Sequence, residues 1–202
     1  MAPLNENQLE QIRHERKEQI MSAALQVFAD NGIKLTKIST IAKAAKVSHG
    51  LIYHYFSSKE EVLYESLKWA TAVNTSTNFL EELKEDKLSP SEKIKKFVLY
   101  AFSSTDSTSS YVFRIIQNSG NKEETPQEVK DYVDSLGTMY INFLIPLIKE
   151  GQEYGEIIQE DSEELVGIFL TTLSGVIADD ITFWQEDMER KVEILLRMIT
   201  TR

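Results

Sequence analysis

The 202-residue sequence contains no cysteine. A chain without thiols cannot form disulfides, a thiolate zinc site, a cysteine nucleophile or a thiol redox switch. Histidine is also scarce: His49 and His54 lie five residues apart with no carboxylate or cysteine beside them, and His14 fits a solvated helix position. We therefore expect no metal ion and no other cofactor.

Long apolar runs are missing too. No stretch of about 18 apolar residues, the length needed to cross a bilayer, occurs in the chain. The first ten residues are polar and lack the apolar segment of a secretory leader. These two absences predict a cytoplasmic protein.

Glycine and proline are rare, at eight and four residues, and alternating β-branched patterns are uncommon, so the periodicity predicts an all-α protein. The first long helix is expected from Glu10 to Asp30, and Asn31-Gly32 supplies its end. Four later helix starts are predicted, because an N-cap residue is followed three positions on by glutamate. These N-cap residues are Ser58, Ser89, Thr125 and Asp161.

Acidic residues outnumber basic ones by 32 to 22, but they are unevenly distributed. Residues 1–70 hold nine basic and eight acidic residues, whereas residues 71–202 hold 13 and 24. Between Asn31 and Lys59 there are five lysines and no acidic residue. This lysine-rich segment is either a solvated basic face or a surface that meets phosphates.

The lysine-rich segment has the pattern of two short helices joined by a tight turn. The apolar face of the first is formed by Ile38, Ile41, Ala42 and Ala45. Ser48 can cap the second helix, which would bury Leu51 and Ile52. Such a pair forms a helix-turn-helix, whose second helix enters the DNA major groove.

The first 65 residues resemble the TetR family of bacterial transcription regulators. The matching residues are Ala23 to Gly32, Thr36, Ile41-Ala42, Ala45, Val47-Ser48, Gly50, Ile52-Tyr53, Tyr55-Phe56 and Lys59-Glu60. The resemblance implies a three-helix DNA-binding domain over residues 1–57, ordered from about residue 10. It also implies a helical bundle over residues 58–202 that binds a small-molecule effector and forms a homodimer.

Carried over by position, the resemblance implies which residues contact a palindromic double-stranded DNA operator. They are Thr36, Lys37, Ser48, His49, Gly50, Tyr53, His54 and Lys59. Thr36, Lys37 and Lys59 are expected at phosphates, and Lys59 also lies at a helix start. His49 stands where many relatives carry lysine or arginine, which puts the specificity there in question.

Two further sets of residues are candidates for the effector pocket and the dimer interface. Possible pocket walls are Phe79, Phe97, Tyr100, Phe113, Ile116, Tyr140, Phe143 and Phe169, although core filling is the more common role of such residues in a helical domain. Possible interface residues on the last two long helices are Leu165, Ile168, Thr172, Val176, Val192, Leu195, Leu196 and Ile199.

Two other functional interpretations remain open at this stage, and a third is not expected. A TetR-like activator would use the same DNA-binding residues as a repressor. A helical interaction module could use its basic face to bind an acidic protein. An enzyme is not expected, because the sequence contains no phosphate-binding glycine loop, no G-x-S-x-G elbow and no H-E-x-x-H pair.

Overall fold

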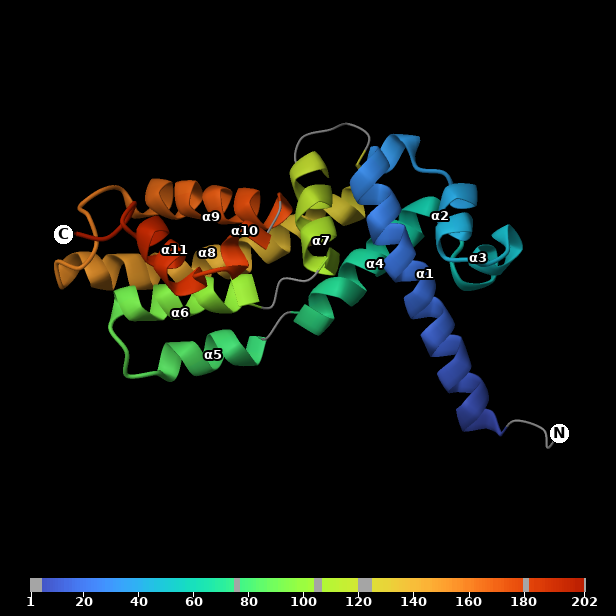
Figure 1. Cartoon of the computed structure of the whole chain (residues 1–202), viewed down its shortest axis with the longest axis horizontal. Coiled ribbons are helices and arrows are strands. Elements are labelled where there is room, and N and C mark those ends of the chain that lie inside the picture. Colours follow the sequence, from blue (N-terminus) through green and yellow to red (C-terminus); the bar gives the residue numbers. More distant parts are fainter. Residues whose placement is uncertain (1–4, 75–76, 104–106, 120–124, 180–181, 202) are drawn as a thin grey trace.

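The computed structural model describes residues 5–74, 77–103, 107–119, 125–179 and 182–201. These residues fold into helices, with one isolated β-bridge between Ile157 and Thr200 (Figure 1). The helices are α1 (Glu6–Leu35), α2 (Ile38–Ala44), α3 (His49–Tyr55), α4 (Lys59–Asn74), α5 (Thr77–Glu85), α6 (Pro90–Ser103), α7 (Ser107–Ser119), α8 (Gln127–Glu153), α9 (Ser162–Ala178), α10 (Thr182–Gln185) and α11 (Met188–Leu196). The predicted all-α class is confirmed.

Helix α1 starts earlier than the sequence pattern predicts. Asn5 and Gln8 form a reciprocal capping box, so the helix begins at Glu6, and its first turns project from the body of the molecule (Figure 1). The predicted break is present: Gly32 has a φ of 74°, a left-handed conformation that glycine adopts without strain. One more helical turn follows it and ends at Leu35.

Most of the predicted helix starts are confirmed. Ser58 and Ser89 accept hydrogen bonds from backbone N–H groups three residues on, and Asp161 accepts two such bonds at 2.9 Å. The predicted cap at Thr125 is wrong. Its hydroxyl donates instead to the Ser119 carbonyl, and α8 begins after Pro126, which has no side chain that can cap the helix.

The buried apolar side chains form two clusters. The larger part of the chain, from α5 to the C-terminus, encloses one around Phe102, Leu144 and Phe169. The other surrounds α1 and the three helices that follow it, but it also takes in Val112 and Ile115 from α7. Helix α7 packs along α1 as well as against α9, so it connects the N-terminal helices to the rest of the molecule.

The end of the chain is tied to the turn between α8 and α9. Backbone N–H groups of Ile158 and Thr201 donate across the bridge to the carbonyls of Ile199 and Glu156, each at 2.9 Å. Gly151 permits this close approach, because a Cβ atom there would lie 2.5 Å from the Ile157 side chain. No helix within the described ranges is long and apolar enough to cross a membrane.

Candidate nucleic-acid interface and ligand cavity

Helix α3 packs against the protein through one side and exposes its other side to solvent. Ile52 is fully buried, and Ser48 caps the helix by accepting from the Leu51 N–H at 3.2 Å. His49, Gly50 and His54 are exposed. Tyr53 is half exposed, and its ring meets His49 edge to face at 5.2 Å. Four of the predicted contact residues therefore lie together on one accessible face of α3.

The turn between α2 and α3 is fixed by its own backbone hydrogen bonds and by a contact from α1. Lys46 adopts a left-handed φ of 54°, and the Val47 N–H donates to the Ala42 carbonyl at 3.0 Å. Ala45 is buried, and its carbonyl accepts a bond of 2.7 Å from Gln19 on α1. The small side chains of α2 let the helices approach closely, and the turn then aims α3 outward.

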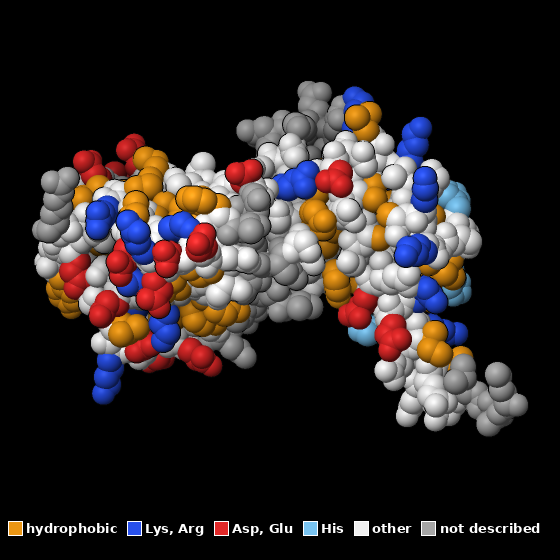
Figure 2. Space-filling view, in the orientation of Figure 1, with side chains coloured by type: hydrophobic (Ala, Val, Ile, Leu, Met, Phe, Trp, Pro, Cys, Tyr) orange, Lys and Arg blue, Asp and Glu red, His pale blue; other side chains and the backbone are white. Residues whose placement is uncertain are grey.

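Basic side chains surround this exposed face. Lys37, Lys43 and Lys46 are all exposed on or beside α2. Figure 2 shows Lys, Arg and His side chains at the end of the molecule that carries α2 and α3, whereas many Asp and Glu side chains lie over the opposite end. The lysine-rich segment thus forms a cationic surface around α3, suited to a polyanion.

The structure revises the expectation for Thr36. Its side chain is 2 % exposed, and its hydroxyl donates to the Gly32 carbonyl at 2.7 Å. A hydroxyl has a single proton, so no side-chain donor remains for a phosphate. Thr36 instead closes the last turn of α1 and thereby sets the position of α2.

Lys59 also has a structural partner. Its ammonium donates to the Ile33 carbonyl at 2.9 Å, and the Lys34 carbonyl lies 3.5 Å away. It therefore satisfies carbonyls at the C-terminal end of α1, where a positive charge is favourable. Its ammonium has three protons, so it can also donate to a phosphate.

Replacing Lys59 by methionine is expected to lower the free energy of unfolding by about 1 kcal/mol, because the Ile33 carbonyl loses a charged donor. Chemical denaturation measures this change. A phosphate contact would show separately, as a decrease of about one in the slope of log affinity against log salt. An unchanged unfolding midpoint would contradict the structural role.

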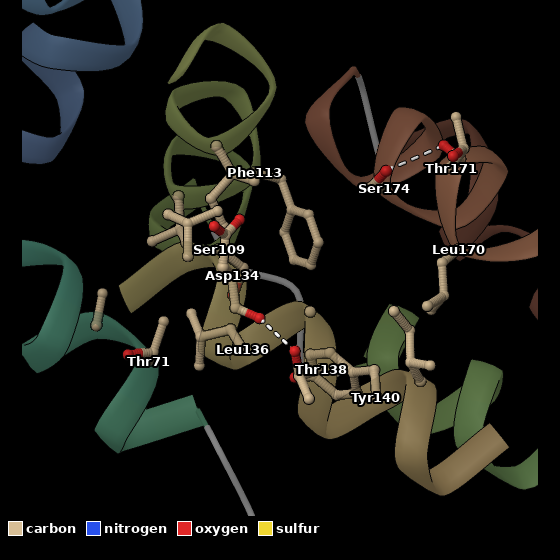
Figure 3. A pocket seen from close by; sticks show the side chains of 16 residues that line it. Thr71, Ser109, Phe113, Asp134, Leu136, Thr138, Tyr140, Leu170, Thr171 and Ser174 are labelled. Atoms are coloured by element: carbon tan, nitrogen blue, oxygen red, sulfur yellow. Dashed lines mark hydrogen bonds between the residues drawn. The ribbon is translucent and has the colours of Figure 1, made fainter. Parts of the chain in front are cut away.

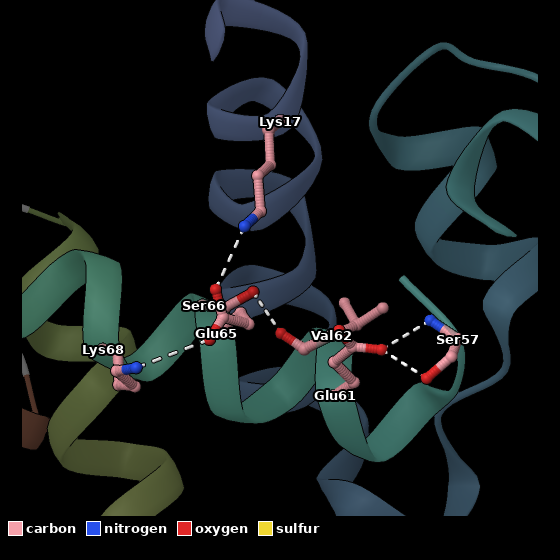
Figure 4. Close-up of polar contacts among 7 residues, drawn as sticks. All are labelled: Lys17, Ser57, Glu61, Val62, Glu65, Ser66 and Lys68. Carbon is pink, nitrogen blue, oxygen red and sulfur yellow. Dashed lines mark hydrogen bonds and ion pairs between the residues drawn. The ribbon is translucent and has the colours of Figure 1, made fainter. Parts of the chain in front are cut away.

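Polar side chains join α1 to α4 (Figure 4). Lys17 pairs with Glu65 at 3.0 Å, and Glu18 accepts a bond of 3.0 Å from the indole N–H of Trp69. At the start of α4, Glu61 accepts bonds from the backbone and hydroxyl of Ser57, which lower the pKa of its carboxyl group. The contacts of Lys17 and Glu18 hold α1 on α4, and those of Ser57 fix the start of α4.

A cavity of about 540 Å³ lies between α4, α7, α8 and α9 (Figure 3). Its size is typical of sites for small molecules. Most of its wall is apolar, as illustrated by Val112, Leu136 and Leu170. Polar atoms reach it from α8 and α9, including those of Asp134 and Thr171, on opposite sides of the space in Figure 3.

The cavity includes three of the eight aromatic and aliphatic residues predicted to line a pocket, namely Phe113, Ile116 and Tyr140. The other five lie elsewhere. Phe97, Phe143 and Phe169 are at most 6 % exposed in the core, and Phe79 stacks on Tyr100 with ring centroids 3.9 Å apart. Their predicted role as pocket walls is not supported, and core packing accounts for them.

The sequence pattern missed most of the cavity's polar wall. The missed residues include Thr71, Asp134, Thr138, Thr171 and Ser174. No local signal could have identified them, because each is a common residue on a helix surface. Only the packing of α4, α8 and α9 around the cavity makes their side chains face a common space. Burial of the Tyr140 ring raises the pKa of its hydroxyl, so that group remains neutral.

The residues predicted for the dimer interface divide into two sets. Five are buried within the chain itself: Leu165, Val192, Leu195, Leu196 and Ile199. They stabilise the protomer and present no surface to a partner. Ile168 is 59 % exposed, and Thr172 and Val176 are partly exposed. Nearby helices add further exposed apolar side chains, those of Phe183, Ile194 and Met198.

Comparison with known proteins agrees with this architecture. The family model for bacterial regulatory proteins of the tetR family matches residues 20–65. The fatty acid metabolism regulator protein of Bacillus subtilis is 29% identical over 171 residues, which cover 82% of this chain and 81% of that protein.

Solved structures share the whole fold. The fatty acid degradation regulator FadR from Bacillus halodurans is 26% identical with a TM-score of 0.65, covering 91% of this chain and 93% of its own. The ketosteroid transcriptional regulator KstR2 of Mycobacterium tuberculosis has a TM-score of 0.73 at 19% identity, covering 93% and 96%. The chain belongs to the tetR family of bacterial regulatory proteins, which are DNA-binding transcriptional regulators.

Proposed function

We propose that this chain is a homodimeric repressor that occupies a palindromic operator and leaves it when a small molecule fills the cavity. The observation that carries this proposal is the exposed face of α3, set in a cationic surface and held from behind by buried Ile52. A helix presented in this way fits the major groove, where base edges differ in their donors and acceptors.

The contacts to DNA are assigned by position on this surface. Gly50 allows α3 to approach the groove closely, and His49, Tyr53 and His54 reach base edges or phosphates beside it. Ser48 and Lys37 lie at the starts of α3 and α2, where phosphates are favoured by free N–H groups and by positive charge. Lysines of the same surface supply the salt-dependent part of the affinity.

A two-fold symmetric dimer requires an interface surface that is not buried within the protomer. The exposed apolar side chains of Ile168 on α9 and Ile194 on α11, with Met198 just beyond α11, offer such a surface. Gly167 and Thr172 have small side chains or none, so a helix of the partner can approach α9 closely. Pairing these faces would place the two α3 helices on successive half-sites.

Helix α7 provides the connection between cavity and DNA-binding helices. Phe113 and Ile116 of α7 line the cavity, while Arg114 between them points to α1. The Arg114 guanidinium pairs with Asp30 at 3.1 Å and donates to the Ala29 carbonyl at 3.2 Å. A ligand that moves α7 must therefore move α1, which changes the separation of the two α3 helices.

Replacing Arg114 by methionine is expected to reduce the coupling between ligand and DNA by about 1 kcal/mol, roughly fivefold in the ligand's effect on operator affinity. The variant keeps the apolar stem of arginine but loses both contacts to α1. Operator affinity is measured with and without a ligand found by screening for thermal stabilisation.

The matched control replaces Lys95, which pairs with Glu193 at 2.6 Å between α6 and α11, far from α1. Lys95→Met should leave the ligand response unchanged. Equal responses in the Arg114 variant and the wild type would show that coupling follows another route.

The proposal as a whole is tested by selecting binding sites for the purified protein from random genomic fragments. Recovery of a palindrome, bound by a dimer and released by a small molecule, is the expected result. A folded dimer that selects no sequence would overturn the proposal and favour binding of an acidic protein instead. Salt dependence alone does not separate these outcomes, because both interactions are electrostatic.

A further inference from the structure

Three aliphatic hydroxyl groups of α8 and α9 at the cavity, those of Thr138, Thr171 and Ser174, have already used their protons. Thr138 donates to the Asp134 carbonyl at 2.8 Å, and Thr171 donates to the Gly167 carbonyl at 2.8 Å. Ser174 donates to the Thr171 carbonyl at 3.0 Å, a bond visible in Figure 3. Since a hydroxyl has one proton and two lone pairs, each of these groups offers a ligand only an acceptor.

The charge of the cavity wall also favours a ligand that donates hydrogen bonds. Asp134 is the one charged side chain among the described residues that line the cavity, and no lysine, arginine or histidine is among them. An anionic ligand would lose part of its hydration here without gaining a cationic partner, which is unfavourable. A cationic ligand would gain a carboxylate and several acceptor oxygens.

The aromatic wall favours the same class of ligand. Phe113 and Tyr140 both line the cavity, and the faces of their rings attract cations. The remaining wall is apolar, so a ligand needs a hydrocarbon body as well as a donor group. The required molecule is therefore amphipathic, with its charge directed to the α8 side of the cavity.

We propose that the cavity binds a hydrophobic amine in its protonated form, with Asp134 as the counterion. This inference rests on the proposed function, because it names the class of effector for the same cavity. An apolar pocket alone would not specify the charge of its ligand, whereas this proposal predicts a positive charge. The acceptor-only hydroxyl groups and the carboxylate make that prediction together.

The test uses three compounds with the same phenylbutyl body: 4-phenylbutylamine, 4-phenylbutanol and 4-phenylbutanoate. Calorimetric titration of the full chain should rank the amine above the alcohol, with the carboxylate weakest. Asp134 is exposed to solvent, so Asp134→Asn should reduce the preference for amine over alcohol by up to about fivefold, the upper end of the range for an exposed ion pair. Alcohol binding should change little.

Asp131→Asn is the matched control. Asp131 is exposed on the same helix, one turn before Asp134, and accepts a bond from Gln127 instead of lining the cavity. It removes the same charge from α8 but should leave the amine preference intact. An equal loss in both variants would assign the effect to the overall acidity of the protein and overturn the proposal.

Other results also separate this inference from the proposed function. Failure of the amine to bind, or carboxylate binding as tight as amine binding, would overturn the ligand class. If the carboxylate binds and releases the operator, the repressor function stands with another effector. If the amine binds as predicted but never changes operator affinity, the ligand class stands and the ligand-released repressor fails.

Discussion

Replacing Gly50 by leucine is expected to weaken operator binding by about 3 kcal/mol, more than a hundredfold in Kd, without destabilising the free protein. A Cβ atom at Gly50 meets nothing within 4 Å in the free chain. The added side chain therefore has open space until α3 enters the groove, where it collides with DNA. Electrophoretic shift or fluorescence anisotropy with the selected operator measures the loss.

The stability of the same variant is the internal control. Gly50 has an ordinary helical backbone, so a larger residue should leave the thermal midpoint unchanged or raise it slightly. Gly50→Ala should show an intermediate loss of affinity, since its methyl group intrudes less. Tight operator binding by the leucine variant would show that α3 does not enter the groove, which would contradict the assignment of the DNA surface.

Replacing Ile168 by glutamate is expected to separate the dimer into protomers of 23.1 kDa. Ile168 is 59 % exposed in the protomer, so the change leaves the core intact but places a charge in the proposed interface. Operator affinity should fall by about 10² to 10⁴, because each protomer then binds its half-site alone. Light scattering gives the mass, and anisotropy gives the affinity.

Tyr154→Glu provides a control for surface charge. Tyr154 is 66 % exposed at the turn after α8 and belongs to neither α9 nor α11. This variant should remain dimeric and bind the operator normally. A dimeric Ile168 variant with normal operator affinity would show that the protomers associate through another face.

Local sequence signals were sufficient for most of the helix ends and for the exposed face of α3. The break at Gly32 depends on its own backbone freedom, and the caps at Ser48 and Asp161 depend on residues two or three positions away. Interactions of such short range are specified by the sequence itself. The exposed positions on α3 follow equally from a period of 3.6 residues once Ile52 is buried.

The roles of other residues depend on which partner they meet. A threonine and a lysine in a basic segment both suggested phosphate contacts, but the fold buries Thr36 and brings Lys59 to the carbonyl of Ile33. Sequence periodicity also identifies a buried helix face without showing what covers it. Leu195 and Leu196 are buried within their own protomer, whereas Ile194 beside them remains exposed.

The sequence by itself therefore determined the helical class, the helix-turn-helix and the cationic surface around it, since these follow from local propensity, caps and the absence of acidic side chains. Only the tertiary structure decided which residues form the cavity, how α7 connects it to α1, and which apolar side chains are left for a partner. These features depend on the angles and contacts between helices distant in the chain, and no single helix carries that information.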